Sequence, residues 1–260
     1  MRKIFTIITV VYNGEKSIEK TLKSVLDQDN SLFQYIVIDG KSKDKTMYIV
    51  SRYKSIDIVI SDKDKGVYDA MNKGIELATG EWILFMNSGD TFANKDTLKE
   101  VFQLIDDKTE IIYGDTIGII SRNKYYLKAN PLGSILNRGM PFCHQSVFVR
   151  TGILLQNKFN LKYKILSDFD MFRKFYMLGF TFKHINIPIS IYDYEGGFSF
   201  NNPLLCFKEK SEIIGLVNNK IEFRIRYLFL KIKIVIMKML PDFFKETYRK
   251  IKYKKYYINE

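Results

Sequence analysis

The sequence predicts an α/β fold built on a doubly wound, mostly parallel sheet, and three observations carry this prediction. Short apolar runs rich in β-branched residues alternate with helical patterns through the first hundred residues. The first of these runs end in the turn dipeptides Asn13-Gly14 and Asp39-Gly40. The chain of 260 residues is long enough for one large domain with an appendage.

The first strand and helix have the clearest patterns. Residues 4–11 form a continuous apolar run, which suits a strand buried on both faces. Asn13-Gly14 ends that strand, and apolar side chains then recur at helical spacing, which predicts a helix over 16–28. These side chains are Ile18, Leu22, Val25 and Leu26.

The same alternation continues along the chain. A second buried strand over 35–38 closes at Asp39-Gly40, and Gly80 supplies a C-terminal stop for a helix over 67–78. This alternation implies parallel strands joined by right-handed crossovers. The remaining expected elements are helices at 44–53 and 96–105 and strands at 56–61, 82–86 and 110–113.

Positive charge is concentrated near the C-terminus. The net charge is +12, of which residues 220–260 carry +8, so the rest of the chain is close to balanced and nucleic-acid binding is not expected. We therefore predict a domain over 1–205 and a basic amphipathic helical tail over 206–260 that lies on an anionic membrane. A helix packed on the domain or on a second subunit is the alternative. The apolar positions of the tail are Ile221, Ile225, Leu228, Ile232, Val235, Ile236 and Met239.

Several classes of protein are disfavoured by what the sequence lacks. It contains neither G-x-G-x-x-G after the first strand nor G-x-x-x-x-G-K-[ST], which argues against dinucleotide oxidoreductases and P-loop enzymes. Two histidines are too few for a multi-histidine metal site. Two cysteines, together with the expected lack of a signal peptide and of a membrane span, favour a cytoplasmic protein.

Polar residues directly follow the expected strands, at the edge where ligands bind to such sheets. Asp39 has the chemistry to accept hydrogen bonds from a base or ribose, although an Asp-Gly turn with a helix cap is the simpler explanation. Asp90 has the chemistry to bind a hard divalent cation, or to form a turn. The complete set is Tyr12-Asn13, Asp39, Ser61-Asp62 and residues 87–90.

Taken together, five motifs make the sequence similar to family 2 glycosyltransferases, inverting enzymes with the GT-A fold. The resemblance covers roughly residues 4–200. The third motif and the later Cys143-His144-Gln145-Ser146 are most similar to the subgroup that builds bacterial surface polysaccharides. The motifs are Thr9-Val10-Val11-Tyr12-Asn13; Asp39-Gly40-x-Ser42-x-Asp44-x-Thr46; residues 64–74, which begin Asp64-Lys65-Gly66; Thr79-Gly80-Glu81-Trp82-Ile83; and Asn87-Ser88-Gly89-Asp90.

The resemblance implies a site for a nucleotide-diphosphate sugar and for a divalent cation, Mn or Mg. Asp90 would be the metal ligand. Because position 88 is Ser where the family's Asp-x-Asp motif has Asp, coordination rich in water is expected. The residues implied for nucleotide-sugar binding are Thr9, Tyr12, Asn13, Asp39, Asp64, Lys65, Gly66, Asn72, Asn87 and His144.

The general base implied by the resemblance is Asp168, with Asp170 as the alternative. Both belong to Ser167-Asp168-Phe169-Asp170, which departs from the family's Glu-Asp-x-Asp at its first position. A carboxylate is ionised at neutral pH and takes a hydroxyl proton as the new bond forms. Helix N-capping is the structural alternative for these side chains.

The resemblance thus implies an inverting hexosyl- or N-acetylhexosaminyl-transferase, peripheral at the inner face of the cell membrane. Its acceptor would be a lipid-linked glycan in surface polysaccharide synthesis. Residues 1–115 would bind the nucleotide sugar and 116–205 the acceptor, and homo-oligomer formation stays open. The alternatives are a catalytically inactive scaffold in a polysaccharide assembly complex and a nucleotidyltransferase. The latter needs a basic glycine-rich loop after the first strand, which Tyr12-Asn13-Gly14-Glu15 does not supply.

Overall fold

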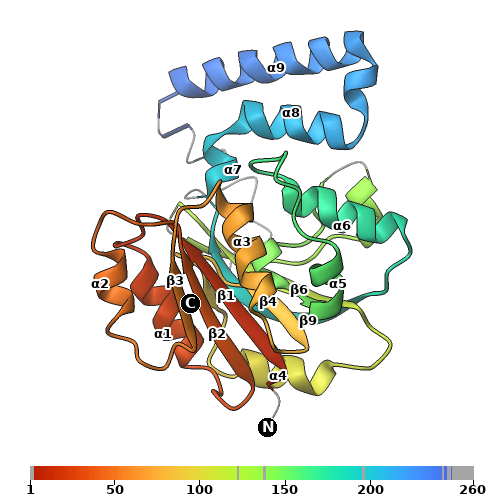
Figure 1. Ribbon diagram of the computed structural model, residues 1–260. Helices are drawn as coiled ribbons and strands as arrows, with labels where there is room; N and C mark the ends of the chain where they lie inside the picture. The colour runs from red at the N-terminus through yellow and green to blue at the C-terminus, as the bar shows by residue number, and fades with distance from the viewer. Residues whose placement is uncertain are drawn as a thin grey trace.

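A computed structural model describes residues 3–121, 123–136, 139–194, 197–241, 243–244 and 247. A single mixed sheet lies between layers of helices, and a helical hairpin lies above one end of it (Figure 1). The strands are β1 (Phe5–Val11), β2 (Phe33–Asp39), β3 (Ile58–Ser61), β4 (Trp82–Phe85), β5 (Thr91–Phe92), β6 (Ile111–Ile120), β7 (Asn123–Leu127), β8 (Val147–Arg150) and β9 (Phe182–Asp193).

The helices follow the expected alternation in the first half and then become less regular. They are α1 (Ile18–Leu26), α2 (Thr46–Val50), α3 (Val67–Glu76), α4 (Thr97–Leu104), α5 (Thr151–Gln156), α6 (Ser167–Met177), α7 (Phe198–Asn201), α8 (Pro203–Ile213) and α9 (Lys220–Met239). Short 3-10 helices lie at Leu132–Leu136, His144–Ser146 and Leu216–Asn218.

The predicted parallel arrangement of the first four strands is confirmed. The strand order is β3-β2-β1-β4-β8-β6-β9-β5, and β1 pairs in parallel with both β2 and β4. The later strands depart from this arrangement: β5 and β7 are antiparallel to β9 and β6, respectively, and β8 is antiparallel to β4 and β6. The chain of β8 enters from residues 139–146, beside the carboxyl end of β4, so it has to run back along the sheet.

Several element boundaries differ from the expectation by a few residues, and two of the differences have a clear physical reason. Helix α2 begins at Thr46 rather than at 44, because the Asp44 carboxylate accepts a hydrogen bond from the Thr46 backbone N–H and stays outside the helix. Strand β6 continues to Ile120 rather than ending at 113, because its second half pairs with both β7 and β9.

The continuous apolar runs are explained by a core on both faces of the sheet. In β1, Ile8 packs with residues of α3, whereas Ile7 packs with residues of α1 on the opposite face. Because successive side chains of a strand point to opposite faces, a strand covered by helices on both sides needs apolar residues at every position. Trp82, in β4, is likewise fully buried.

Gly80 serves a purpose that its sequence position did not indicate. Helix α3 ends before it, with Leu77 as the C-cap, and a Cβ atom on Gly80 would lie 2.5 Å from the Phe5 carbonyl carbon. The residue therefore allows the chain entering β4 to pass close to the backbone of β1.

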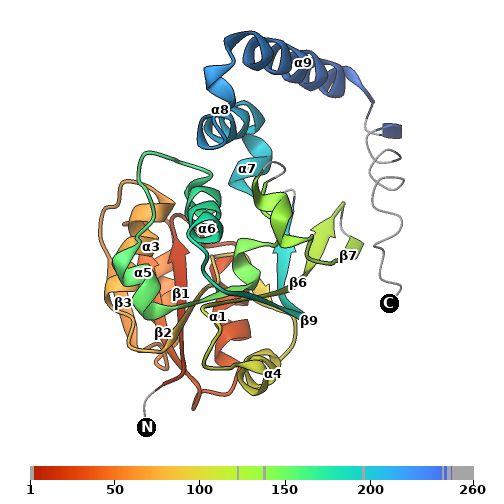
Figure 2. The same cartoon turned by 90° about the vertical axis from the view of Figure 1, so that its right-hand side faces the viewer.

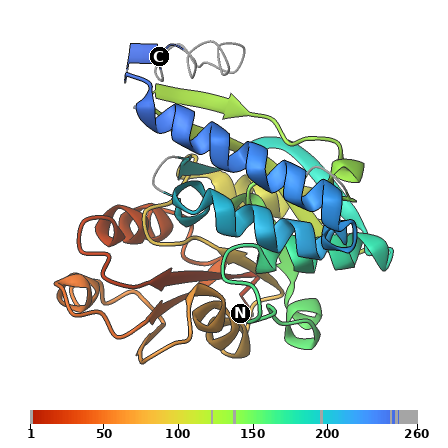
Figure 3. The ribbon, with the colours of Figure 1, turned by 90° about the horizontal axis from the view of Figure 1, so that it is seen from above.

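The C-terminal region forms a hairpin of α8 and α9 that stands above the sheet (Figures 1 and 2). Seen from above, it covers the later part of the chain and leaves the red and orange N-terminal part uncovered (Figure 3). The expected domain boundary at 205/206 falls inside α8, whose Glu209 and Ser211 are buried. None of the described helices is long and apolar enough to cross a membrane. The basic segment over 245–257 lies outside the described residues, apart from Thr247.

Helix α9 spans Lys220–Met239, within the expected tail, and has apolar side chains on two faces. Phe223 and Tyr227 pack against Phe207 of α8 with ring centroids 5.7 and 5.9 Å away. The apolar positions predicted from the sequence form a second stripe that remains exposed, from Ile221 to Met239. Packing on the rest of the described chain therefore does not cover this stripe.

We expect the substitution Gly80→Ala to lower the free energy of unfolding by about 1–3 kcal/mol, because the added methyl group meets backbone atoms that cannot move aside. Urea denaturation measures the change. Gly152→Ala is the matched control, since a Cβ atom there has no neighbour within 4 Å among the described residues. Equal stabilities of the two variants would contradict the close packing of β1 and Gly80.

Candidate active site

The turns after β1 and β2 are joined by hydrogen bonds between their polar residues. The Asn13 backbone N–H donates to Ser42 Oγ at 2.7 Å, and the Lys43 N–H donates to Asn13 Oδ1 at 2.9 Å. Asp44 and Thr46 accept the backbone N–H groups of Glu15 and Gly14. The spacing Asp39-x-x-Ser42-x-Asp44-x-Thr46 therefore supplies the contacts that hold these turns together at the carboxyl edge of the sheet.

Asp39 organises this edge from a fully buried position. Its carboxylate accepts hydrogen bonds from the Ser42 backbone N–H and from the Ser42 and Ser61 hydroxyls. A Cβ atom on the neighbouring Gly40 would lie 2.4 Å from Asp64 Oδ2 and 3.4 Å from Tyr12 Cδ2. Three predicted donor-binding residues thus lie close together, and Tyr12 is 62% exposed.

The segment before α3 contains the other predicted donor-binding residues on this edge. Gly66 has φ +124°, a conformation that side chains with a Cβ rarely adopt, and its N–H donates to Asp64 Oδ1. The Lys65 backbone N–H donates to Asp69 Oδ2, and the Lys65 side chain is exposed. Gly66 is the N-cap of α3, so this turn leads directly into a helix N-terminus.

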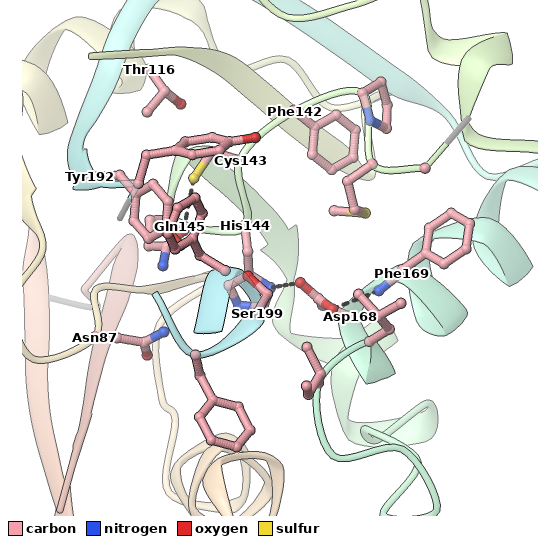
Figure 4. Close-up of a pocket in the computed structure, with 18 of the residues that line it drawn as sticks. Asn87, Thr116, Phe142, Cys143, His144, Gln145, Asp168, Phe169, Tyr192 and Ser199 are labelled. Atoms are coloured by element: carbon pink, nitrogen blue, oxygen red, sulfur yellow. Dashed lines mark hydrogen bonds and ion pairs between the residues drawn. The ribbon is translucent and has the colours of Figure 1, made fainter. Parts of the chain in front are cut away.

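A cavity of about 710 Å³ opens beside this edge, between α3, residues 139–146, the start of α6 and α7. Of the predicted site residues, Asn87, His144 and Asp168 line it. Figure 4 shows His144 and Asp168 facing each other, with Gln145, Cys143 and Tyr192 on the side of His144 away from Asp168. The cavity thus brings together side chains from segments that are far apart in the sequence.

Asp168 is held in place by neighbours from two helices. The Tyr68 hydroxyl of α3 lies 2.9 Å from Asp168 Oδ1 and 2.5 Å from the Ile165 carbonyl oxygen. The Phe169 backbone N–H also donates to Oδ1, at 2.8 Å. Burial, and then the charge of Asp168, raise the pKa of Tyr68 well above its ordinary value, so Tyr68 stays protonated and able to donate.

His144 contributes two nitrogens that have no hydrogen-bond partner in the part of the chain that the structure describes. Its Nδ1 lies 3.6 Å from Asp168 Oδ2, and the rings of Phe85 and Phe159 pack on it with centroids 5.4 and 5.8 Å away. A buried polar group without a partner is costly, so this imidazole suits a polar ligand in the cavity.

Asp90 is buried behind Gln145, whose Nε2 donates to Asp90 Oδ2 at 2.9 Å. Burial raises the pKa of Asp90 from 3.8 to about 7. Asn87 Oδ1, at the carboxyl end of β4, is buried and has no partner among the described residues. The described part of the chain contains no cluster of three His, Cys, Asp or Glu side chains for a metal, so a cation here depends on Asp90, Asn87 and oxygens from substrate or water.

Three predicted site residues have structural partners instead. The buried Thr9 hydroxyl donates to the Met86 carbonyl oxygen and contacts the Tyr35 hydroxyl, so it connects strands rather than lining the cavity. Both polar atoms of the Asn72 side chain bond to the backbone of Phe159. Asp170, the alternative base, is buried and pairs with Lys174 one helical turn along.

Arg150 follows the cavity-lining segment 139–146 in the sequence but lies at the opposite edge of the sheet. It pairs with Glu81, and its guanidinium lies 4.2 Å from the centroid of the Trp82 ring. In the register of β4 and β8, Arg150 faces Trp82 at the amino end of β4. It is therefore separated from the cavity by the length of the strand.

Sequence reasoning did not assign roles to Tyr68, Gln145 and Tyr192, which all line the cavity. Tyr68 and Gln145 lie within motifs that carry the family resemblance, so those motifs could have indicated both as site residues. Cys143 also lines the cavity, and burial raises the pKa of its thiol to about 12, so it is not a nucleophile at neutral pH.

The chain has an α/β fold with a cavity beside the carboxyl edge of its sheet, the place where ligands bind to such sheets. The family model described as "Glycosyl transferase family 2" matches residues 6–175. The chain therefore belongs to glycosyltransferase family 2 and is a glycosyltransferase, as its motifs implied.

Two curated relatives illustrate the similarity in sequence. A PGL/p-HBAD biosynthesis glycosyltransferase of Mycobacterium bovis is 32% identical over 204 residues, which cover 75% of this chain and 79% of the relative. The amylovoran biosynthesis glycosyltransferase AmsB of Erwinia amylovora is 29% identical over 216 residues, which cover 72% of this chain and 69% of the relative.

Solved structures confirm the GT-A fold. TarS 1–349 of Staphylococcus aureus, in complex with UDP-GlcNAc, superposes with a TM-score of 0.65 at 22% identity and covers 81% of this chain. The mannosyltransferase PcManGT of Pyrobaculum calidifontis, in complex with GDP-Man and Mn²⁺, gives a TM-score of 0.63 at 15% identity and covers 84%. This chain spans 65% of the length of each of these structures.

Because its pKa is raised, Asp90 makes stability depend on pH in a defined direction. Between about pH 4 and pH 7 the folded protein holds a proton that the unfolded chain releases, so the free energy of unfolding falls as pH rises, by at most about 4 kcal/mol. We expect Asp90→Asn to remove this fall. Urea denaturation in EDTA from pH 5 to pH 8 measures it, and identical pH profiles for both proteins would contradict the raised pKa.

Proposed function

We propose that the protein is an inverting transferase that moves a hexosyl or N-acetylhexosaminyl group from a nucleotide-diphosphate sugar to a hydroxyl group of a lipid-linked glycan, in the synthesis of a cell-surface polysaccharide. The observation that carries the proposal is the Asp168 carboxylate, which lines the cavity beside the His144 imidazole, with 3.6 Å between Asp168 Oδ2 and His144 Nδ1. The names of the mycobacterial and Erwinia relatives, both biosynthetic glycosyltransferases, support the setting.

The donor nucleotide would bind at the edge formed by the turns after β1 and β2, which we call the donor edge. The exposed ring of Tyr12 offers a surface for a base, and Asn13 and Asp39 keep the turns in place beneath it. The turn with Asp64, Lys65 and Gly66 leads into α3, whose N-terminus favours the negative charge of a phosphate. The sugar would then reach toward Asn87 and His144 in the cavity.

Asp168 would act as the general base. Its carboxylate accepts the proton of the acceptor hydroxyl while that oxygen forms a bond to the anomeric carbon. The bond from the anomeric carbon to the diphosphate oxygen breaks at the same time on the opposite face, so the configuration inverts. Tyr68 holds Oδ1, which leaves Oδ2 for the incoming hydroxyl.

The residues present fit a divalent cation that keeps phosphate or water oxygens among its ligands. Asp90 would supply a carboxylate oxygen and Asn87 its unpartnered carbonyl oxygen, once the Gln145 amide releases Asp90. When bound, the cation would neutralise charge on the departing diphosphate. PcManGT, which has the same fold, was solved with Mn²⁺.

A membrane-bound acceptor is supported by the surface around the cavity and the hairpin. Lys128, Lys164 and Lys210 line the cavity and suit an acceptor that carries phosphate. Helix α9, which packs on α8, carries six basic side chains and a single acidic one, Glu222, beside its exposed apolar stripe. Apolar and basic residues on one exposed helix match the surface of an anionic membrane, where each basic residue contributes about 1 kcal/mol.

We expect Asp168→Asn to lower kcat by roughly 10²–10⁴-fold while nucleotide binding is retained, because the variant removes the base and leaves the donor edge unchanged. Product formation from UDP-, GDP- and dTDP-sugars measures kcat, and thermal shifts with each nucleotide, with and without Mn²⁺, measure binding. Asp170→Asn is the control and should keep most of the activity. Full activity of Asp168→Asn would exclude it as the base, and a wild-type protein that binds no nucleotide would favour the scaffold alternative.

The double substitution Leu228→Gln/Ile232→Gln tests the membrane surface, because it makes the middle of the exposed stripe polar. We expect it to weaken sedimentation with phosphatidylglycerol-containing vesicles at least about tenfold. Met177→Gln/Leu178→Gln, at an exposed site on α6, is the control and should bind like the wild type. Equal binding to neutral phosphatidylcholine vesicles would contradict the contribution of the basic side chains, and a stable dimer that does not bind vesicles would contradict a membrane role.

A further inference from the structure

The loop that leads into α6 is bound by a carboxylate from the C-terminal hairpin. Glu209 of α8 accepts the backbone N–H groups of three consecutive residues. Its Oε1 lies 2.8 Å from the nitrogen of Lys164, and its Oε2 lies 3.0 and 2.9 Å from those of Ile165 and Leu166. Three donors on one side chain make this the most extensively bonded carboxylate between the hairpin and the rest of the described chain.

The environment of Glu209 makes these hydrogen bonds strong. The side chain is 6% exposed, so water does not compete for its oxygens. Hydrogen bonds to an ionised group are shorter and stronger than neutral ones. Without the carboxylate, the buried N–H group of Ile165 and the partly buried N–H groups of Lys164 and Leu166 would lose their acceptor, which is costly for the loop in its present conformation.

The same loop is held on its other side by Tyr68, which contacts the Ile165 carbonyl oxygen as well as Asp168. Glu209 therefore binds the N–H groups of residues 164–166, and the Ile165 carbonyl oxygen of the same segment contacts Tyr68, the residue whose hydroxyl also contacts Asp168. Only Ser167 separates Leu166 from Asp168. A displacement of residues 164–166 would therefore move Asp168 relative to the cavity.

We propose that Glu209 is a positioning residue for Asp168, and that α8 is thus a part of the active site rather than a tail attached to it. This inference rests on the proposed role of Asp168 as the base. Glu209 does not line the cavity and acts through the loop, by fixing residues 164–166 so that Asp168 faces the acceptor hydroxyl.

The test compares Glu209→Gln with Glu212→Gln. Both substitutions replace a carboxylate by an amide on α8, but Glu212 is more exposed and pairs with the Lys162 side chain rather than with the backbone. We expect Glu209→Gln to lower kcat about 10- to 100-fold, since small misplacements of a reacting group have effects of this size. The donor KM should stay within about threefold, because the donor edge is elsewhere, and Glu212→Gln should match the wild type.

Each kcat is calculated per nucleotide-binding site in the sample, so that unfolded protein does not lower the value. If Glu209→Gln and Glu212→Gln give equal kcat per site, even when the former melts at a lower temperature, Glu209 only stabilises the fold and the inference is overturned. Should Glu209→Gln not fold, Glu209→Asp replaces it, with a smaller loss of kcat expected and an unchanged kcat again overturning the inference.

A second measurement uses Tyr68→Phe. Because Glu209 and Tyr68 hold the same loop, the loss of kcat in Glu209→Gln/Tyr68→Phe should be smaller than the product of the two single losses. Independent, multiplicative losses would contradict a shared loop. Absence of transfer by the wild-type protein with every donor would instead refute the proposed function, so the two failures are distinguishable.

Discussion

The contact between Tyr68 and Asp168 joins the two halves of this enzyme, and much of the site depends on it. Tyr68 stands at the start of a helix packed on the central strand, whereas Asp168 stands at the start of α6, 100 residues later. Each partner is positioned by other parts of the fold: α3 by its apolar face against Ile8, and α6 by Phe169 and Phe172 in the same core. Small shifts in either layer therefore reach the carboxylate directly.

The edge formed by the turns after β1 and β2 is built on a different physical basis. Its parts are short turns, and they are held by side chains of Asp, Asn, Ser and Thr that bond to backbone N–H groups across neighbouring turns. Such turns contribute few apolar contacts. Their rigidity comes from hydrogen bonds that are partly shielded from water, which explains why these polar residue types recur where the strands end.

The strands β1 to β4 were predictable because each is a local apolar run between turn residues, and the motif spacing located Asn87, His144 and Asp168 at the cavity. Other features depend on partners that are distant in the sequence. The reversal of β8 follows from where residues 139–146 lie, and the position of Gly80 depends on the backbone of Phe5. Thr9 and Asn72 carry the right chemistry for a ligand, but neighbouring segments occupy their polar atoms.

The place where α8 ends has a practical consequence for handling this protein. Gly215 has φ +78° and turns the chain from α8 toward α9, so the hairpin has a natural boundary there. A shortened chain that stops at 205 discards Glu209 together with α9, whereas one that stops at 214 discards α9 and keeps Glu209. The second truncation removes the exposed apolar stripe and retains the carboxylate that binds residues 164–166, although it also uncovers Phe207, on which Phe223 and Tyr227 pack.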